Sequence, residues 1–253
     1  KPSLDRKPMR RRKLKAKEYK EGGSELFGRI VWIDETPIRG NDRRGYKRIS
    51  LPTYKHYVMA QFRAAFGLNF KGPCGIWTRE TKAERDESIK KVRIENQRRK
   101  QKAKRKFLKE QKELESRPGY KRKPGRIPKF RWSDLKRSDR GGIDWYNHRE
   151  TWLKRHLIPF LKSLKEQMGP EFQPMLMEAG AAAHKARCNE EFYEENGIEK
   201  LDWVGNSPDL NPIEKAWAWV RKRVALRKPR NFEERCQFWR EECEALLQEQ
   251  INQ

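Results

Sequence analysis

At 253 residues the chain is long enough to bury a real core, either as one domain with an insertion or as two small domains. No apolar run approaches the roughly 20 residues that span a bilayer, and no secretory signal is visible, which argues against a membrane or secreted protein. The four cysteines form no CxxC pair and the four histidines are not at zinc-ligand spacing. We therefore expect a reducing intracellular compartment and no structural zinc site. Because the sequence begins with Lys1 instead of Met, we expect a fragment of a longer protein.

The formal net charge of +25 is concentrated in two segments. Residues 1–20 carry 10 Lys/Arg against 2 acids, and residues 78–138 carry 24 against 9, so the remaining chain is close to neutral. This distribution predicts two polyanion-binding elements attached to an ordinary domain, with a solvated charged helix as the alternative for 78–138. Nucleic acid is favoured over membrane because neither segment has a strong apolar face, although the charge does not distinguish DNA from RNA. A basic N-terminal segment also fits nuclear localisation, so we expect a nuclear protein.

The first part of the chain predicts a basic arm and three strands. Residues 1–27 have little to bury and are expected to form a linker or arm. Residues 28–33 form a near-continuous apolar run, typical of a central strand, and Pro37 should end it, which would place Asp34 at the strand's C-terminal end. Residues 57–67 and 72–77 predict a second and a third strand joined as a hairpin.

A long basic insertion is expected after the third strand. Residues 81–116 contain no Pro or Gly and predict a charged helix with only a thin apolar stripe. A basic loop with several Pro and Gly residues follows, and Phe130 and Trp132 are expected to anchor its return to the domain.

The remaining chain alternates between helices and strands. Residues 144–168 predict an amphipathic helical region with a kink or break at Pro159. A strand at 172–177, a helix at 185–196 closed by Gly197, a strand at 198–204 and a last helix at 232–250 follow. The order predicts an α/β domain with a mixed sheet flanked by helices, spanning 28–253 and interrupted by the basic insertion at 78–138.

The segment SPDLNPIE, residues 207–214, runs directly into a helical pattern. Asn211 suits an N-cap and Pro212 the first helical position, which would place Glu214 at the third. One interpretation is a capping box, in which Glu214 only reaches back to the Asn211 amide. The other is a fixed helix start that presents the carboxylate of Glu214 at an active site.

Three segments together resemble the catalytic blocks of Tc/mariner-type DDE transposases: WIDE at 32–35, MEAGAAAH at 177–184 and SPDLNPIE at 207–214. The resemblance implies an RNase H-like fold and metal-dependent DNA strand cleavage and strand transfer at transposon ends. It implies catalytic carboxylates at Asp34, at position 179 and at Glu214, the last two separated by 34 residues. It also implies two Mg²⁺ or Mn²⁺ ions, transposon-end and target DNA as partners, and a homodimer on DNA. Two ions would activate the attacking oxygen and stabilise the leaving oxygen.

The sequence departs from this pattern at Ala179, where the resemblance implies the second Asp. Glu178 and Glu35 should not replace it, because successive side chains of a strand point to opposite faces. With only Asp34 and Glu214 as metal ligands, we expect weakened metal binding and a catalytically dead chain. Ala179 is either an engineered change or a natural loss. In the second case the chain is a domesticated, non-catalytic DNA-binding protein on the same fold. A retroviral-type integrase or a simple RNase H-like nuclease is a weaker third hypothesis.

Basic residues outside the three blocks are candidates for DNA binding. They lie in the loop after the first strand, in the basic insertion and beside the second block. For His184, the residue beside the second block, a structural role is an equal alternative. The candidates are Arg43, Arg44, Lys47, Arg48, Arg98, Arg99, Lys102, Lys104, Arg105, Lys106, Lys121, Arg122, Lys123 and His184. Because no helix-turn-helix module is found, we expect contacts mainly with the DNA backbone and weak sequence preference.

Overall fold

The computed structural model describes residues 6–39, 58–121, 128–139, 142–204 and 207–252. It divides into two compact units, one formed by Lys1–Arg79 with Ile143–Gln253 and the other by Glu80–Gly142. Among the described residues, none of the helices is long and apolar enough to cross a membrane. Each unit has its own packing.

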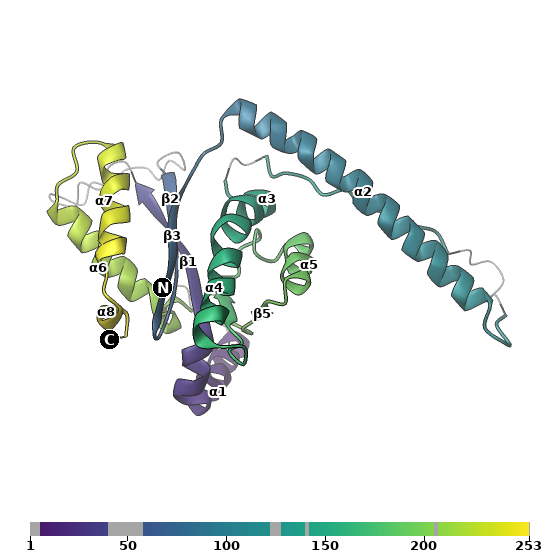
Figure 1. The fold of residues 1–253 in the computed structure, drawn as a ribbon, viewed down its shortest axis with the longest axis horizontal. Helices are drawn as coiled ribbons and strands as arrows, with labels where there is room; N and C mark the ends of the chain where they lie inside the picture. The colour runs from purple at the N-terminus through teal and green to yellow at the C-terminus, as the bar shows by residue number, and fades with distance from the viewer. Residues whose placement is uncertain (1–5, 40–57, 122–127, 140–141, 205–206, 253) are drawn as a thin grey trace. The chain divides into compact units, whose positions relative to one another are not determined.

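The larger unit is built on a mixed five-stranded sheet with the order β3-β2-β1-β4-β5 (Figure 1). β1 pairs antiparallel with β2 and parallel with β4; β2–β3 is antiparallel and β4–β5 parallel. The strands are β1 Ile30–Arg39, β2 Val58–Gly67, β3 Phe70–Thr78, β4 Met175–Glu178 and β5 Glu199–Lys200. This arrangement confirms the predicted α/β class with a mixed sheet.

β1 is longer than the sequence predicts, because Pro37 lies inside it, opposite Gln61 of β2. The parallel pairing with β4 ends at Ile33, so beyond that point β1 has no partner on the β4 side. A missing backbone N–H is tolerated on such an unpaired edge. Asp34 is therefore in the middle of β1, although it is the first residue beyond the end of the β1–β4 pairing.

Helices cover both faces of this sheet (Figure 1). On one face, α6 (Ile213–Leu226) and α7 (Phe232–Ala245) bury a core around Phe62, Trp217 and Trp239. A last short helix, α8 (Gln248–Ile251), follows α7. Trp217, Val220 and Val224 are 1%, 0% and 4% exposed, so this row of α6 is helix core.

The opposite face is covered by three consecutive helical segments and by α5. They are α3 (Trp145–Asn147), the π-helix η1 (His148–Leu157), α4 (Ile158–Met168) and α5 (Arg187–Glu195). The expected break at Pro159 takes the form of this π-to-α change, with Pro159 as the second residue of α4. π-Helical turns are rare and often lie at functional sites.

The strands on either side of α5 are shorter than the sequence predicts. β4 begins three residues later than expected, and β5 has only two residues instead of seven. After α5 the chain turns at Gly197, whose φ of 62° suits a glycine. Pairing with a neighbouring strand, which apolar content alone cannot specify, decides these bounds.

The prediction of a linker with little to bury at the N-terminus is wrong for residues 6–27, and residues 28 and 29, predicted as the start of the first strand, are helical as well. They form α1 (Arg6–Arg29), with a non-helical break at Gly23. Tyr19 of α1 is 6% exposed, stacks on Trp203 with ring centroids 5.7 Å apart, and donates a 2.7 Å hydrogen bond to the Asp202 carbonyl. Lys15 adds an ion pair of 3.0 Å with the Asp202 carboxylate. A few well-placed contacts thus hold a strongly basic helix against the sheet domain.

The smaller unit is a long helix with a returning segment beside it that has no regular secondary structure among its described residues. α2 (Lys82–Glu115) begins at a capping box formed by Thr81 and Glu84, close to the predicted bounds. The Asn96 side chain both donates to the Leu135 carbonyl and accepts from the Leu135 amide, at 2.9 Å each, and so ties the returning segment to α2.

Aromatic rings add to this packing within the smaller unit. Phe107 of α2 lies 5.7 Å from Phe130, which stacks on Trp132 at 6.5 Å. Phe130 and Trp132 thus have an aromatic partner on α2, whereas their expected anchoring of the insertion to the sheet domain stays a prediction.

Candidate active site at the end of the β1–β4 pairing

Asp34 and position 179 are neighbours across the parallel strands β1 and β4. The last pair of the register is Ile33 with Glu178, so the next positions along the two strands are Asp34 and Ala179. Adjacent strands lie about 4.8 Å apart, and facing residues of a parallel pair point to the same side. Asp34 and Ala179 therefore share the face of the sheet that α6 covers.

The Asp34 carboxylate is held by two hydrogen bonds in a mostly buried position. The Glu35 amide donates to its Oδ1 at 2.8 Å, and the Asn211 side-chain Nδ2 donates to its Oδ2 at 3.3 Å. Burial raises the pKa of Asp34 to about 6, and the negative charges of Glu35 and Glu214 act in the same direction. Asp34 thus lies close enough to Glu214 for the two carboxylates to repel each other.

Glu214 reaches this site from the start of α6, but not through the capping box considered from the sequence. Pro212 is the N-cap and has no side-chain cap hydrogen bond, so Glu214 is the second helical residue. Asn211 instead accepts from the Ile213 amide at 3.3 Å while its Nδ2 donates to Asp34. The Asn211 side chain bridges β1 and α6, which gives it a tertiary partner that no local motif announces.

The three positions implied for the active site now hold two hard oxygen ligands and one methyl group. Asp34 and Glu214 have carboxylates of the kind that Mg²⁺ prefers, whereas Ala179 has no ligand atom. Ala179 is only partly buried and the following Gly180 is exposed, so the site has room for a larger side chain at position 179.

The other two acids of the first and second blocks point away from this site, as strand alternation predicts. Glu35 and Glu178 lie on the opposite face with His148, His184 and Tyr193, and we call these five residues the opposite-face cluster. The candidate assignment of His184 to DNA binding is wrong, because its side chain is 2% exposed and lies between Glu35 and the Ala179 carbonyl. The equally weighted structural role fits this position.

Charges inside the opposite-face cluster shift each other's protonation strongly. Burial acts to raise the pKa of Glu35, but the neighbouring His184, Arg63 and His148 together lower this pKa to about 2. Burial acts to lower the pKa of His184, but Glu35 and Glu178 raise it to about 9. The sequence contains no local signal for this cluster, since its members are scattered from position 35 to position 193.

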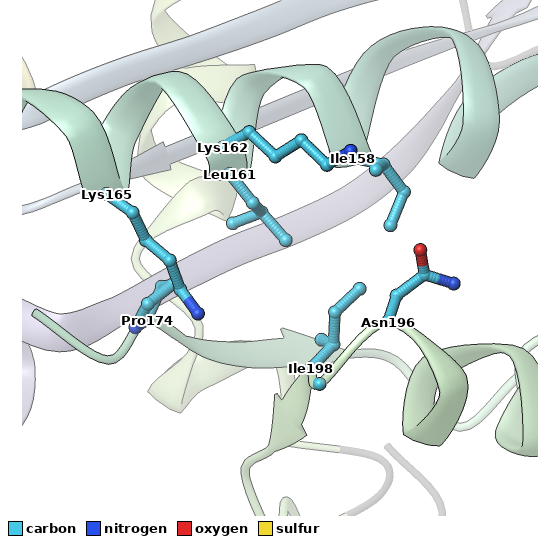
Figure 2. A pocket seen from close by; sticks show the side chains of 8 residues that line it. Ile158, Leu161, Lys162, Lys165, Pro174, Asn196 and Ile198 are labelled. Carbon is cyan, nitrogen blue, oxygen red and sulfur yellow. The ribbon is translucent and has the colours of Figure 1, made fainter. Parts of the chain in front are cut away.

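Two cavities lie near these elements. A groove of about 830 Å³ adjoins Glu214 and is lined largely by apolar side chains, among them Phe27, Trp32 and Trp219. A second pocket, shown in Figure 2, lies between α4 and the turn at Gly197 and measures about 60 Å³. It is too small for a nucleotide and contains no carboxylate, so of these two cavities the groove is the one that suits the candidate active site.

The basic candidates of the insertion form a row along α2, which we call the α2 basic row. All its members are exposed except Arg99, which is partly buried and lies 3.9 Å from Glu95. The row consists of Arg98, Arg99, Lys102, Lys104, Arg105 and Lys106. Lys121 is exposed as well. The candidates Arg43, Arg44, Lys47, Arg48, Arg122 and Lys123 lie outside the described residues.

Comparison with known proteins finds one family and one group of structures. Residues 130–236 match the sequence model of the DDE superfamily endonuclease family, a span that includes Ala179 and Glu214 but not Asp34. No curated protein sequence is significantly similar to the chain.

Among solved structures, the chain is similar to the catalytic domain of Mos1 mariner transposase, with 13% identity, a TM-score of 0.44, and coverage of 99% of this chain and 94% of that one. A structure of that catalytic domain with raltegravir and Mg gives 15% identity, a TM-score of 0.43 and coverage of 99% and 96%. The Mos1 paired-end complex with Mn gives 14% identity, a TM-score of 0.42, and coverage of 99% of this chain and 63% of that one. This chain therefore spans less than two thirds of that longer chain.

Proposed function

We propose that this chain is the catalytic domain of a DDE-type DNA transposase in which Ala at position 179 has removed the central metal ligand. The substrate class is double-stranded DNA carrying transposon ends, and the parent reaction is phosphodiester cleavage followed by strand transfer. The nucleus is the proposed compartment, and a homodimer on DNA is the proposed assembly. The family match over residues 130–236 supports the superfamily.

One observation supports this proposal: segments that are far apart in the sequence meet around Asp34. The β1–β4 register pairs Ile33 with Glu178, one position before Asp34 and Ala179, and the Asn211 side chain links the segment before α6 to Asp34. Three carboxylates at such positions would form a hard-oxygen site at the end of a parallel strand pair. In the chain as it stands, two of the three are present.

The residues present do not fit a pair of divalent ions. Two ions bring four positive charges, and Asp34 and Glu214 supply only two negative ones. The shared ligand expected between the ions is absent at Ala179, and neither Glu35 nor Glu178 can replace it because both lie on the other face. No metal-dependent step is therefore assigned to the chain as written, and DNA binding is the activity that it retains.

Restoring the missing carboxylate tests the proposal directly. Ala179→Asp should give Mg²⁺- or Mn²⁺-dependent cleavage and strand transfer on transposon-end DNA, assayed in gels with labelled ends. Ala179→Asn is the matched control, since it has nearly the same shape without the charge. Glu214→Gln in the Ala179→Asp background should lower the restored cleavage rate by several orders of magnitude, as expected when one member of a catalytic unit is lost.

The second candidate function is a domesticated DNA-binding protein on the same fold, and Ala179 itself favours it. If folded Ala179→Asp protein binds end DNA but neither cleaves nor joins it, the catalytic proposal is refuted and the binding function remains. If the chain binds RNA in preference to DNA at equal salt, both candidates fail. Far-UV circular dichroism of each variant shows whether a missing activity reflects a misfolded protein.

A further inference from the structure

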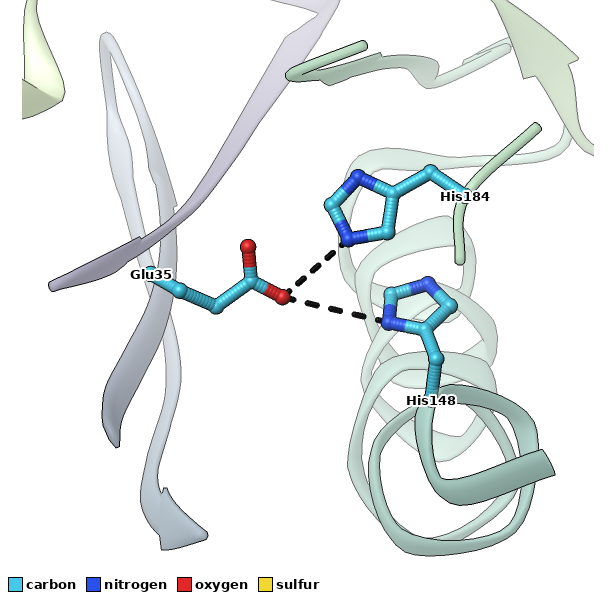
Figure 3. Close-up of side chains that lie close together, drawn as sticks. All are labelled: Glu35, His148 and His184. Carbon is cyan, nitrogen blue, oxygen red and sulfur yellow. Dashed lines mark hydrogen bonds and ion pairs between the residues drawn. The ribbon is translucent and has the colours of Figure 1, made fainter. Parts of the chain in front are cut away.

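Three possible metal ligands from distant parts of the chain meet on the sheet face opposite Asp34. They are Glu35 of β1, His148 at the start of η1 and His184 in the turn before α5 (Figure 3). Glu35 Oε1 lies 3.1 Å from His184 Nε2 and 3.9 Å from His148 Nδ1, and all three ligand atoms lie within 4.8 Å of one another. Bonds of about 2.0–2.1 Å to a tetrahedral ion would separate neighbouring ligand atoms by about 3.3 Å. The observed distances to Glu35 are within about 0.6 Å of that value.

The other nitrogen of each imidazole is already engaged, which turns the remaining nitrogen toward Glu35. His184 Nδ1 lies 2.7 Å from the Ala179 carbonyl oxygen, and a carbonyl can only accept, so Nδ1 carries the donated proton. His148 Nε2 lies 3.0 Å from Glu178 Oε1, and the Tyr193 hydroxyl donates to the second oxygen of that carboxylate at 2.7 Å. In metal sites, ligating histidines regularly donate their second N–H to a carboxylate or a backbone carbonyl. The cluster has one partner of each kind.

The His148 ring needs a partner that the protein does not provide. It is 0% exposed, and its Nδ1 has no hydrogen-bond partner. A buried polar atom left unpaired costs about 1–3 kcal/mol. A proton on His184 Nε2 would satisfy the contact with Glu35 but would leave His148 Nδ1 unpaired, whereas one cation between the three atoms would satisfy all of them.

The charges around the cluster select the kind of ion. Arg63 Nε lies 3.7 Å from Glu35 Oε1 and Lys200 Nζ lies 3.4 Å from Glu178 Oε2, so the two carboxylates already have basic partners. The positive charge of Arg63 repels any added cation. The neutral imidazoles of His148 and His184 are therefore the main source of affinity for a metal ion. Imidazole nitrogen suits Zn²⁺ and related transition metals, whereas Mg²⁺ prefers oxygen ligands. This separates the cluster from the carboxylate site on the other face.

We propose that Glu35, His148 and His184 form a buried site for a divalent transition-metal ion, with Zn²⁺ as the expected ion. This proposal departs from the sequence-based expectation of no structural zinc site, because the spacing of the histidines in the sequence does not show that two of them meet Glu35 in the fold. The ion would join β1, η1 and the turn after β4, three segments that no disulfide connects among the described residues. Glu178 and the Ala179 carbonyl would orient the two imidazoles. The proposal does not depend on the transposase function, because metal content and affinity are measured without DNA.

Titration of the metal-stripped protein tests the site. Zn²⁺ in isothermal titration calorimetry should bind at one equivalent, an excess of Mg²⁺ should not displace it, and Co²⁺ should give the visible absorption bands of a tetrahedral ion. His184→Gln should weaken Zn²⁺ binding at least 100-fold, and Glu178→Gln should weaken it 10- to 100-fold through the His148 contact. His156→Gln is the matched control, since His156 is also on η1 but outside the cluster, and it should bind as the parent does.

Because His148 and His184 are buried, a variant that fails to fold would prove nothing by itself. X-ray absorption at the zinc edge of the unaltered protein is therefore the second measurement, and it should show two imidazole nitrogens in the first coordination shell. The absence of stoichiometric Zn²⁺ binding, a first shell without imidazole, or full Zn²⁺ affinity in folded His184→Gln would each overturn the proposal. In those cases the cluster is a buried ion pair between protonated His184 and Glu35.

Discussion

Replacing Asp34 by Asn should stabilise the protein at neutral and alkaline pH. The pKa of Asp34 is raised from its ordinary value of 3.8 to about 6, mainly by burial. The folded state therefore holds its proton more tightly than the unfolded state does. Above pH 6 the buried carboxylate is charged and destabilises the fold, and this penalty disappears as the pH falls from 6 to below 3.8.

The magnitude follows from the shift. A difference of about 2.2 units at about 1.36 kcal/mol per unit corresponds to roughly 3 kcal/mol of destabilisation above pH 6. Asn at position 34 can still accept from the Glu35 amide, but the bond from Asn211 would be weakened, at a cost of about 1 kcal/mol. The net gain is then about 2 kcal/mol, or an increase in Tm of roughly 4–8 °C for a domain of this size.

Thermal unfolding followed by circular dichroism, with EDTA present, measures this effect at pH 8 and at pH 4. Glu171→Gln, which neutralises an exposed carboxylate, serves as the control for the change in net charge. Asp34→Asn should exceed its parent in Tm at pH 8 and match it at pH 4. An unchanged or lower Tm at pH 8, or the same gain at both pH values, would refute the burial argument for Asp34.

Three further predictions concern other parts of the molecule. In the metal-free protein, the pKa of His184 is raised from 6.5 to about 9, so protonated His184 stabilises the fold by about 3 kcal/mol. This stabilisation is fully present below pH 6.5 and is lost as the pH rises through about 9. In urea unfolding, the His184→Gln variant should lack this change of stability with pH. If all six members of the α2 basic row contact phosphates, replacing them by Ala should flatten the slope of log K against log salt by about 5 in DNA-binding titrations, whereas exchanging only its arginines for Lys should preserve the slope. Trp217→Ala should lower the free energy of unfolding by about 3–5 kcal/mol, because Trp217 is 1% exposed, whereas Leu226→Ala on the same helix, 70% exposed, should change it by less than about 0.5 kcal/mol in the same denaturation assay.

Local patterns were sufficient where the deciding interactions lie close together in the sequence. The β2–β3 hairpin and the bounds of α2 follow from short apolar runs, turn residues and a capping box, all of which act over a few residues. Gly197 likewise marks the end of α5 as predicted. In each of these cases the backbone hydrogen bonds are satisfied within the segment or by its immediate neighbour.

Where a partner lies far away in the sequence, local patterns predicted the wrong detail. Residues 6–29 look too charged to pack, yet Tyr19 finds Trp203 and the Asp202 carbonyl. The local pattern favours Asn211 as a helix cap with Glu214 as its partner. In the structure, the side-chain Nδ2 of Asn211 instead donates to the Asp34 carboxylate. Contacts of this kind form between segments that only the folded sheet brings together.

The sequence by itself determined which residues could be ligands: acids at 34 and 214, no acid at 179, and a basic segment at 78–138. It also determined that Glu35 and Glu178 turn away from Asp34, because alternation along a strand is a local property. Only the tertiary structure decided that Glu35 meets His148 and His184 in one buried cluster, since the three come from β1, η1 and the turn before α5. The physical reason is that burial and proximity, which set the protonation and the ligand geometry of these groups, arise only when distant segments pack against the same sheet.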